Sequence, residues 1–417
     1  MSMASLAPAT PTRPALWGYG LFGGLLAMAG LPIYIHAPKF YVDEYGLTLT
    51  TLGTLLFALR AFDFVQDPAL GWLAGRTRAM RGVTVLAAGL VMAGAMLMLF
   101  AIPPALSPML WFALSLTLLF TCYSFLTICF YTTGTQRGAG LGQGGHVYLA
   151  AWRETGALLG VCIAAAAPVA LAGALDAPFA GFALGFGLLA ALALWSMRGE
   201  WGQGADTPPT GFGPILRDSI ARRLLVIALV NALPVAITST LFLFYAEGVL
   251  QAAGWEGPLL ILLFLAAAVS SAVWSRIAAR TGAKAALLSG MALSVGSFIF
   301  VLFLGPGDLA LFALICVLSG IGMGADLTLL PAIFSRRMAQ LSPDAAQGFG
   351  LWAFVTKATL AIAAIIVFPA LDIAGFETGG QNDAASLWAL TLLYGALPSI
   401  LKLLAMALLA MTPLQET

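Results

Sequence analysis

Charged residues are scarce in this sequence: they make up 9% of its 417 residues, whereas soluble globular domains carry about 25%. Hydrophobic residues make up 61%. A composition so poor in charge and so rich in apolar groups excludes an ordinary soluble protein. The formal net charge of +1 also gives no reason to expect nucleic acid as a partner.

Residues that bind metals or cofactors are equally few. The two histidines and four cysteines show none of the clustered spacings of zinc or haem sites. All four cysteines lie within apolar runs, as small buried hydrophobic groups do: Cys122, Cys129, Cys162 and Cys316. We therefore expect no cofactor, and no metal beyond a coupling ion.

Two further absences exclude whole classes of function. The sequence has no Gly-x-x-x-x-Gly-Lys-Ser/Thr loop, which argues against intrinsic ATP-driven pumping. Its longest polar connection, residues 199–219, is too short to be a catalytic domain. We predict that the protein is neither an ATP-driven pump nor an enzyme.

Long apolar runs are what the sequence has in abundance. A helix that crosses a bilayer needs about 20 apolar residues, and continuous runs favour helices over the alternating strands of a barrel. Twelve runs meet this criterion: 14–37, 47–75, 81–101, 106–133, 147–173, 177–198, 220–248, 254–280, 283–304, 307–337, 347–372 and 384–412. We predict an all-α membrane protein with twelve transmembrane helices.

The basic residues of the connections predict its orientation. One alternate set of connections holds thirteen of them: Arg76, Arg78, Arg81, Arg137, Arg198, Arg217, Arg222, Arg223, Arg276, Arg280, Lys284, Arg336 and Arg337. The other set holds only Lys39. By the positive-inside rule, the first set and both termini are cytoplasmic, in a multi-pass protein of the cell (plasma or inner) membrane.

The runs divide into two sets of six. Residues 199–219, rich in Pro and Gly, lie between the sets, and Trp152 and Trp352 hold corresponding places 200 positions apart. Parallel repeats of this kind are the architecture of major facilitator transporters. We predict an N-terminal six-helix bundle at 1–198, a cytoplasmic linker at 199–219, a C-terminal bundle at 220–417, and a monomer.

Eight ionisable residues lie deep inside the predicted spans, away from their ends. Each costs about 2.5–3.5 kcal/mol on insertion scales, so it needs a partner or a function. Four are basic and four acidic, which indicates an internal polar network: Arg60, Asp63, Asp67, Arg153, Glu154, Asp326, Lys357 and Lys402. We expect Lys402, in the last span, to form a structural salt bridge.

Arg60, Asp63 and Asp67 fall on one helical face, because they are spaced by three and seven residues. Two carboxylates one turn apart in a poorly hydrated cavity repel, so either a cation bridges them or one of them binds a proton. The pattern predicts a Na⁺ or H⁺ site at Asp63 and Asp67, to which we add Ser124. The alternative is an Arg60–Asp63 pair that packs the helix, with Asp67 capping the next loop.

Arg153 and Lys357 are deep basic residues at near-equivalent places in the two halves. Either they hydrogen-bond a polar or anionic substrate, or they neutralise carboxylates such as Asp63. Glu154 and Asp326 complete the charge network. Three basic loop residues are expected at a cytoplasmic gate: Arg76, Arg78 and Arg280.

Aromatic and hydroxyl side chains give the remaining candidates for substrate contact. Tyr123, Thr127 and Tyr131 share one face of the fourth span, where they either line a cavity or pack. Trp152 and Trp352 either stack on a substrate ring or pack between helices.

Four segments carry a resemblance to a known family: residues 60–68 (Arg-Ala-Phe-Asp-Phe-Val-Gln-Asp-Pro), 71–72, 151–154 and 352–357. The sequence resembles the glycoside–pentoside–hexuronide:cation symporters, the family of the melibiose carrier. The resemblance implies a cation site at Asp63 and Asp67, with Gln66 where sugar-transporting members often have Asn. It also implies that Arg153 and Lys357 lie near the substrate.

The sequence departs from that family at the sugar site. Leu25 and Thr127 stand where the melibiose carrier has sugar-binding Asp residues, and Tyr131 stands in place of a Trp. The Asp/Asp/Lys pattern also resembles lysolipid-transporting relatives. We predict cation-coupled symport of a small polar, sugar-like or glycoside-like solute. The alternative is transport of a lysolipid-like amphiphile or organic anion, and the two-half repeat argues against a channel.

Overall fold

The computed structural model describes residues 15–202, 211–252, 254–341, 345–376 and 382–414, and within these ranges it is helical, with no strand. The first group of helices is α1 (Trp17–Met28), α2 (Leu31–Tyr45), α3 (Leu49–Arg76), α4 (Arg81–Phe100), α5 (Pro108–Gly140), α6 (Gly145–Leu171) and α7 (Pro178–Met197). A short 3₁₀ turn, η1 (Arg78–Met80), joins α3 to α4.

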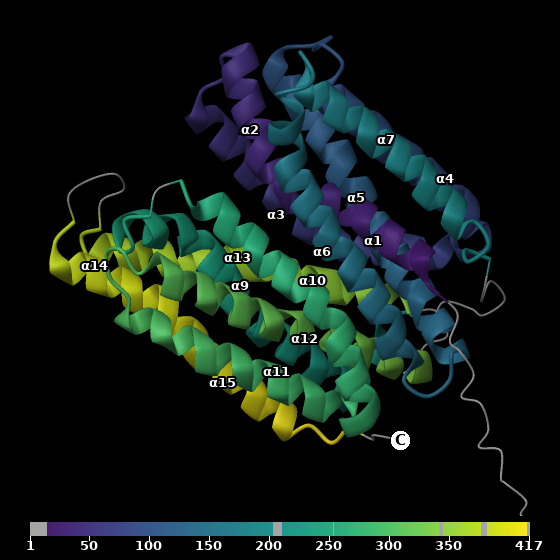
Figure 1. Ribbon diagram of the computed structural model, residues 1–417. Helices are drawn as coiled ribbons and strands as arrows, with labels where there is room; N and C mark the ends of the chain where they lie inside the picture. Colours follow the sequence, from purple (N-terminus) through teal and green to yellow (C-terminus); the bar gives the residue numbers. More distant parts are fainter. Residues whose placement is uncertain (1–14, 203–210, 253, 342–344, 377–381, 415–417) are drawn as a thin grey trace, which may run out of the picture.

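The second group follows the short helix α8 (Gly213–Arg217). It comprises α9 (Ser219–Gly248), α10 (Glu256–Thr281), α11 (Ala283–Phe298), η2 (Ile299–Phe303), α12 (Leu309–Leu341), α13 (Ala346–Ile373), α14 (Ala384–Thr391), η3 (Leu392–Ala396) and α15 (Leu397–Ala410). Figure 1 shows the two groups as two bundles, purple to teal and teal-green to yellow. Residues 203–210 of the predicted linker lie outside the described residues, so the predicted domain boundaries stay a prediction.

Ten helices among the described residues are long and apolar enough to cross a membrane. The two predicted spans missing from this set are 14–37 and 47–75. The first is divided at Ala29–Gly30 into α1 and α2, because the proline at the start of α2 has no N–H to continue a helix. In addition, α2 ends at Tyr45, eight residues past the predicted end of this span. The second is continuous as α3, but Asp63 and Asp67 interrupt its apolar run.

Small residues bring the helices of the first bundle close together. α1 packs along α6, and glycines face each other at Gly20–Gly156 and at Gly24–Gly160. A Cβ atom built at Gly156 would overlap the Gly20 carbonyl oxygen. This close approach replaces the hydrophobic driving force that helices lack inside a bilayer.

The two bundles meet most extensively between α3 and α13 and between α6 and α10. In addition, α5 and α6 contact α12, and α5 contacts α13. A methyl group at Gly71 would lie 3.0 Å from the Gly350 Cα, so the backbones of α3 and α13 nearly touch there. Further along the same end, the Thr135 and Ser335 hydroxyls are 2.7 Å apart, joining α5 to α12. We call this the linker end, because α8, whose residues fall in the predicted linker, packs against α12 there; the predicted orientation makes it cytoplasmic.

Candidate functional site

Lys357 of α13 reaches across to the first bundle and holds two of its carboxylates. Its ammonium donates to Asp63 Oδ1 at 3.0 Å, to Asp67 Oδ1 at 3.1 Å and to Ser124 Oγ at 2.6 Å. An ammonium has three donors, so these contacts use all of them. Asp63 and Asp67 are 2% and 0% exposed, which makes this a buried contact between the two bundles.

Polar side chains of α3 and α5 complete the cluster around Asp63. Its Oδ1 also accepts from the Ser124 hydroxyl at 3.0 Å and from Gln66 Nε2 at 3.3 Å. Gln66 Oε1 in turn accepts from the Thr121 hydroxyl at 3.1 Å. The carboxylate, amide and hydroxyl oxygens gathered here are the ligand types that Na⁺ and other hard cations prefer.

The charges of the cluster do not balance among the described side chains. Asp63 and Asp67 carry two negative charges and Lys357 one positive charge, at 3.0 and 3.1 Å. Among these side chains, Asp67 Oδ2 is buried and accepts no hydrogen bond, although the Lys357 ammonium lies 3.1 Å from it. The side chain of Arg60, predicted to join this network, lies outside the described residues.

A cavity of about 180 Å³ opens beside this cluster, between α5 and α13. Ten residues line it: Tyr123, Ser124, Thr127, Ile128, Tyr131, Phe349, Trp352, Ala353, Thr356 and Lys357. The predicted face of Tyr123, Thr127 and Tyr131 therefore lines a cavity, while Tyr123 and Tyr131 also pack against the core. Lys357 lies at the boundary, with its ammonium 5.8 Å from the centre of the Tyr123 ring.

Arg153 lies behind the wall of this cavity rather than on it. Its Nε donates to Glu154 Oε1 at 2.7 Å, and its guanidinium carbon lies 3.7 Å from the centre of the Tyr131 ring. The Tyr131 hydroxyl donates to the same Glu154 oxygen at 3.2 Å. Arg153 thus supports Tyr131, which is the residue that faces the cavity.

The remaining intramembrane charges pair within the second bundle. Lys402 of α15 donates to Asp326 of α12, and also to Asn231 Oδ1 of α9 at 2.7 Å. The salt bridge predicted for Lys402 is present. Asp326 is far along the chain from the Asp63 cluster and has its own basic partner.

Other predicted site residues lie away from the cavity. Trp152 lies against α1, where its carbonyl oxygen contacts Gly20. Arg76 is at the end of α3, 5.5 Å from the centre of the Trp72 ring. Arg78 lies in η1 and Arg280 in the last turn of α10. Their roles at a gate stay a prediction.

Several residues of the site escaped sequence reasoning. Thr121 lies one turn from Ser124 on α5, and Thr356 precedes Lys357 on α13. A hydroxyl group in an otherwise apolar helix is the sequence feature that could have identified both residues. Phe349 and Asn231 gave none, because aromatic and amide side chains in helices pack more often than they line sites.

The chain is similar to known membrane transporters in sequence and in fold. The family model described as MFS/sugar transport protein matches residues 16–416. A bacterial homologue of the iron transporter ferroportin, in an outward-facing state, is 14% identical, with a TM-score of 0.69 over 95% of this chain and 99% of that one. The human organic anion transporter MFSD10 (TETRAN) is 17% identical, with a TM-score of 0.64 over 94% of this chain and 97% of that one. At these identities, the two structures show the fold alone.

Proposed function

Because the chain belongs to the MFS/sugar transport protein family, whose members move solutes by alternating access, we propose that it is a secondary active, cation-coupled symporter. The observation that carries the proposal is the contact of Lys357 with Asp63 and Asp67 across the two bundles. Na⁺ or H⁺ is the coupling ion, and no other cofactor takes part.

The proposal includes an architecture. The protein spans the cell membrane twelve times, with α1 and α2 forming one broken span and α14, η3 and α15 forming another. Both termini and the central linker face the cytoplasm. Arg76, Arg137 and Arg217 at the linker end support this orientation, because basic residues favour the cytoplasmic side.

Coupling follows from competition for the same carboxylates. A Na⁺ ion or a proton that reaches Asp63 and Asp67 neutralises charge that Lys357 otherwise balances, and so weakens the contact between α3 and α13. Asp67 Oδ2 lies 3.1 Å from the Lys357 ammonium but accepts no hydrogen bond, so it offers a place for a proton once Lys357 withdraws. The oxygens of Ser124 and Gln66 offer further ligands for Na⁺. Relief of this contact lets the bundles rock about the cavity.

The cavity walls support a small polar solute. Tyr123, Tyr131 and Trp352 offer ring faces, and the two tyrosines also carry hydroxyl groups. Thr127 and Thr356 offer hydroxyl oxygens beside Lys357. Aromatic faces and hydroxyls are the groups that bind sugar-like solutes. The resemblance to the melibiose carrier family supports the same class.

An organic anion or lysolipid-like amphiphile is the second candidate. At the two positions where the melibiose carrier has sugar-binding Asp residues, this chain offers no carboxylate to a solute. Thr127 lines the cavity, and Leu25 is fully buried in the core. Lys357 is then the one charged residue among those that line the cavity, which favours an anionic group. Uptake of glucuronate or lysophosphatidylcholine, without uptake of methyl galactoside, would favour this candidate.

The test uses purified protein in liposomes with an imposed Na⁺ or H⁺ gradient. Wild-type protein is expected to accumulate at least one labelled solute from a panel of methyl galactoside, glucuronate and lysophosphatidylcholine, and Asp63→Asn to lose accumulation. Asp176→Asn, an exposed carboxylate outside the cluster, is the matched control and should behave as wild type. Gradient-driven accumulation by Asp63→Asn at the wild-type rate would overturn the proposal.

A further inference from the structure

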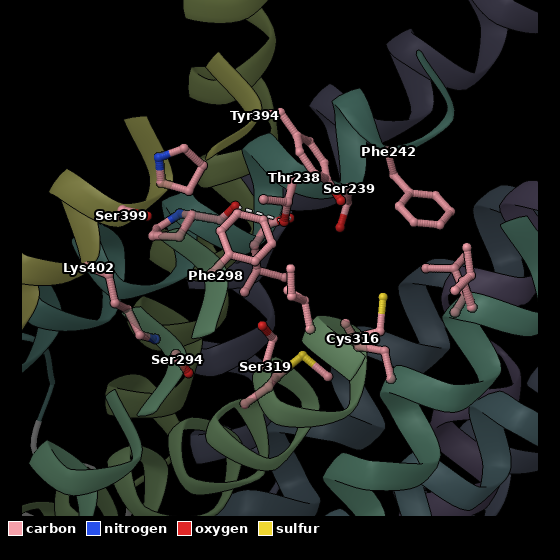
Figure 2. Close-up of a pocket in the computed structure, with 18 of the residues that line it drawn as sticks. Thr238, Ser239, Phe242, Ser294, Phe298, Cys316, Ser319, Tyr394, Ser399 and Lys402 are labelled. Atoms are coloured by element: carbon pink, nitrogen blue, oxygen red, sulfur yellow. Dashed lines mark hydrogen bonds between the residues drawn. The ribbon is translucent and has the colours of Figure 1, made fainter. Parts of the chain in front are cut away.

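A second cavity lies wholly within the second bundle. It has a volume of about 140 Å³ and shares no lining residue with the cavity between α5 and α13. Its walls come from α9, α10, α11, α12, η3 and α15. Figure 2 shows Lys402, Ser319, Cys316 and Phe242 around it.

The walls of this cavity are mainly apolar, and they include several aromatic rings. Phe242, Phe298, Phe312 and Tyr394 contribute rings, and Phe242 and Phe312 stack with their ring centres 6.3 Å apart. An engineered apolar cavity of about 150 Å³ in another protein stays dry and binds benzene. The space here is therefore the size of a single six-membered ring.

The polar part of the lining carries no net charge. It consists of an ion pair and of five hydroxyl side chains: Thr238, Ser239, Ser294, Ser319 and Ser399. Asp326 and Lys402 both line the cavity and form a salt bridge with each other, which Asn231 extends. Both charged side chains are more than nine-tenths buried. A charged ligand would bring a charge with no compensating partner, and such burial is costly. An uncharged ligand with one hydroxyl or N–H group can hydrogen-bond to the polar part of the lining at no such cost.

The helices that form the walls depart from regular geometry at the cavity. Tyr394 lies in the five-residue π-helical segment η3, Pro398 follows it in α15, and Pro234 lies inside α9. Phe298 is the last residue of α11 before the 3₁₀ segment η2. Such segments are frequent at functional sites, and backbone irregularity at membrane depth is tolerated where it is buried in protein or lines a cavity.

We propose that this cavity is a second binding pocket, for an uncharged, ring-sized molecule that carries one hydrogen-bond donor. Phenol is the simplest member of this class. The ring packs against Phe242, Phe298 and Phe312, and the donor group points toward the Asp326–Lys402 pair.

A ligand in the pocket would affect the contact between the two bundles. Phe264 and Met323 line the pocket and also pack against a small cluster that includes Leu158 of α6. A ligand that fixes these two side chains stabilises the packing of α6 on α10. The pocket is therefore an effector site, separate from the proposed path of the transported solute.

The thiol of Cys316, which lines the pocket, provides a direct readout. Cys122→Ala, Cys129→Ala and Cys162→Ala together leave it as the sole cysteine. We expect phenol to slow N-ethylmaleimide labelling of Cys316 in a saturable way. At a phenol concentration of about ten times its Kd, labelling should be about tenfold slower, because Cys316 reacts only while its pocket is empty. Benzene, which lacks a donor, should protect at higher concentration, and benzoate should not protect.

Two variants test that the protection arises in the pocket. Ser319→Phe places a ring in the cavity, so phenol should no longer raise the melting temperature as it does in wild-type protein. Leu314→Phe adds bulk to an exposed position of the same helix and should keep the response.

Three results would overturn the proposal. Equal protection by benzoate and phenol would show that the ligand class is wrong. A phenol response retained in well-folded Ser319→Phe would place the binding elsewhere. If none of the three ring compounds changes the rate of Cys316 labelling, but the acyl-chain length of the surrounding lipid does, a lipid chain occupies the cavity. None of these readouts depends on transport, so this proposal and the symporter proposal fail separately.

Discussion

Lys357 illustrates how much a single buried residue can determine in a membrane protein. It belongs to the second bundle, yet the three hydrogen-bond partners of its ammonium, Asp63, Asp67 and Ser124, belong to the first. Removing one partner of a buried ion pair typically costs about 3–5 kcal/mol, because the remaining charge is left uncompensated. Lys357 therefore stabilises this arrangement of the bundles as well as the cluster itself.

We predict that Lys357→Met lowers the melting temperature most at high pH and low salt. Without the ammonium, Asp63 and Asp67 repel each other, and either protons or Na⁺ must replace the lost charge. Stability should therefore recover as the pH falls or as Na⁺ is added, and wild-type protein should respond less. Thermal unfolding in detergent, at several pH values and with choline as the control salt, measures this.

A double variant separates charge from packing. Asp67→Asn combined with Lys357→Met removes one charge of each sign, so it should be more stable than Lys357→Met alone at high pH. If the double variant is the less stable of the two, the carboxylate repulsion is not the cause.

At the scale of helices, the sequence predicted most elements but not their irregularities. The run 220–248 corresponds to α9 (Ser219–Gly248), because a long apolar run has one stable conformation in a bilayer. The break between α1 and α2 and the π-helical segment η3 were missed. Such features depend on tertiary contacts that compensate for lost backbone hydrogen bonds, and a single sequence does not reveal these contacts.

The same limit applies to the site. Helical spacing was enough to place Asp63 and Asp67 on one face and to identify the face of Tyr123 and Thr127. It left open which carboxylate Lys357 meets, because that depends on how α3 and α13 pack. The pocket in the second bundle escaped prediction altogether, since its walls come from separate helices that no local pattern connects.

The packing of α1 on α6 gives an element-scale prediction. Gly156→Ala places a methyl group against the Gly20 carbonyl oxygen, which cannot move without shifting α1. Overpacking of this kind costs about 1–3 kcal/mol, so the melting temperature should fall. Gly187→Ala in α7, where nothing lies within 4 Å of the added carbon, is the control and should be neutral or slightly stabilising. Equal melting temperatures for the two variants would contradict close packing of α1 on α6.

At the scale of the whole molecule, the arrangement is closed at the linker end. The Thr135–Ser335 contact joins α5 to α12, and His146 Nδ1 lies 3.2 Å from the same Ser335 hydroxyl. Gly71 and Gly350 bring α3 and α13 together at this end. Alternating access requires each of these contacts to open once per cycle, because the solute must pass through the end that is now closed.

We therefore predict that covalent closure of the linker end stops transport reversibly. Thr135→Cys and Ser335→Cys, in a background without the four native cysteines, replace two hydroxyls 2.7 Å apart. Oxidation should form a disulfide that abolishes solute accumulation in liposomes, and dithiothreitol should restore it. Each single cysteine variant controls for oxidation damage and should transport under both conditions. Full transport by protein shown by mass spectrometry to be cross-linked would mean that the solute does not pass this end, and the rocking of the two bundles about the cavity would have to be abandoned.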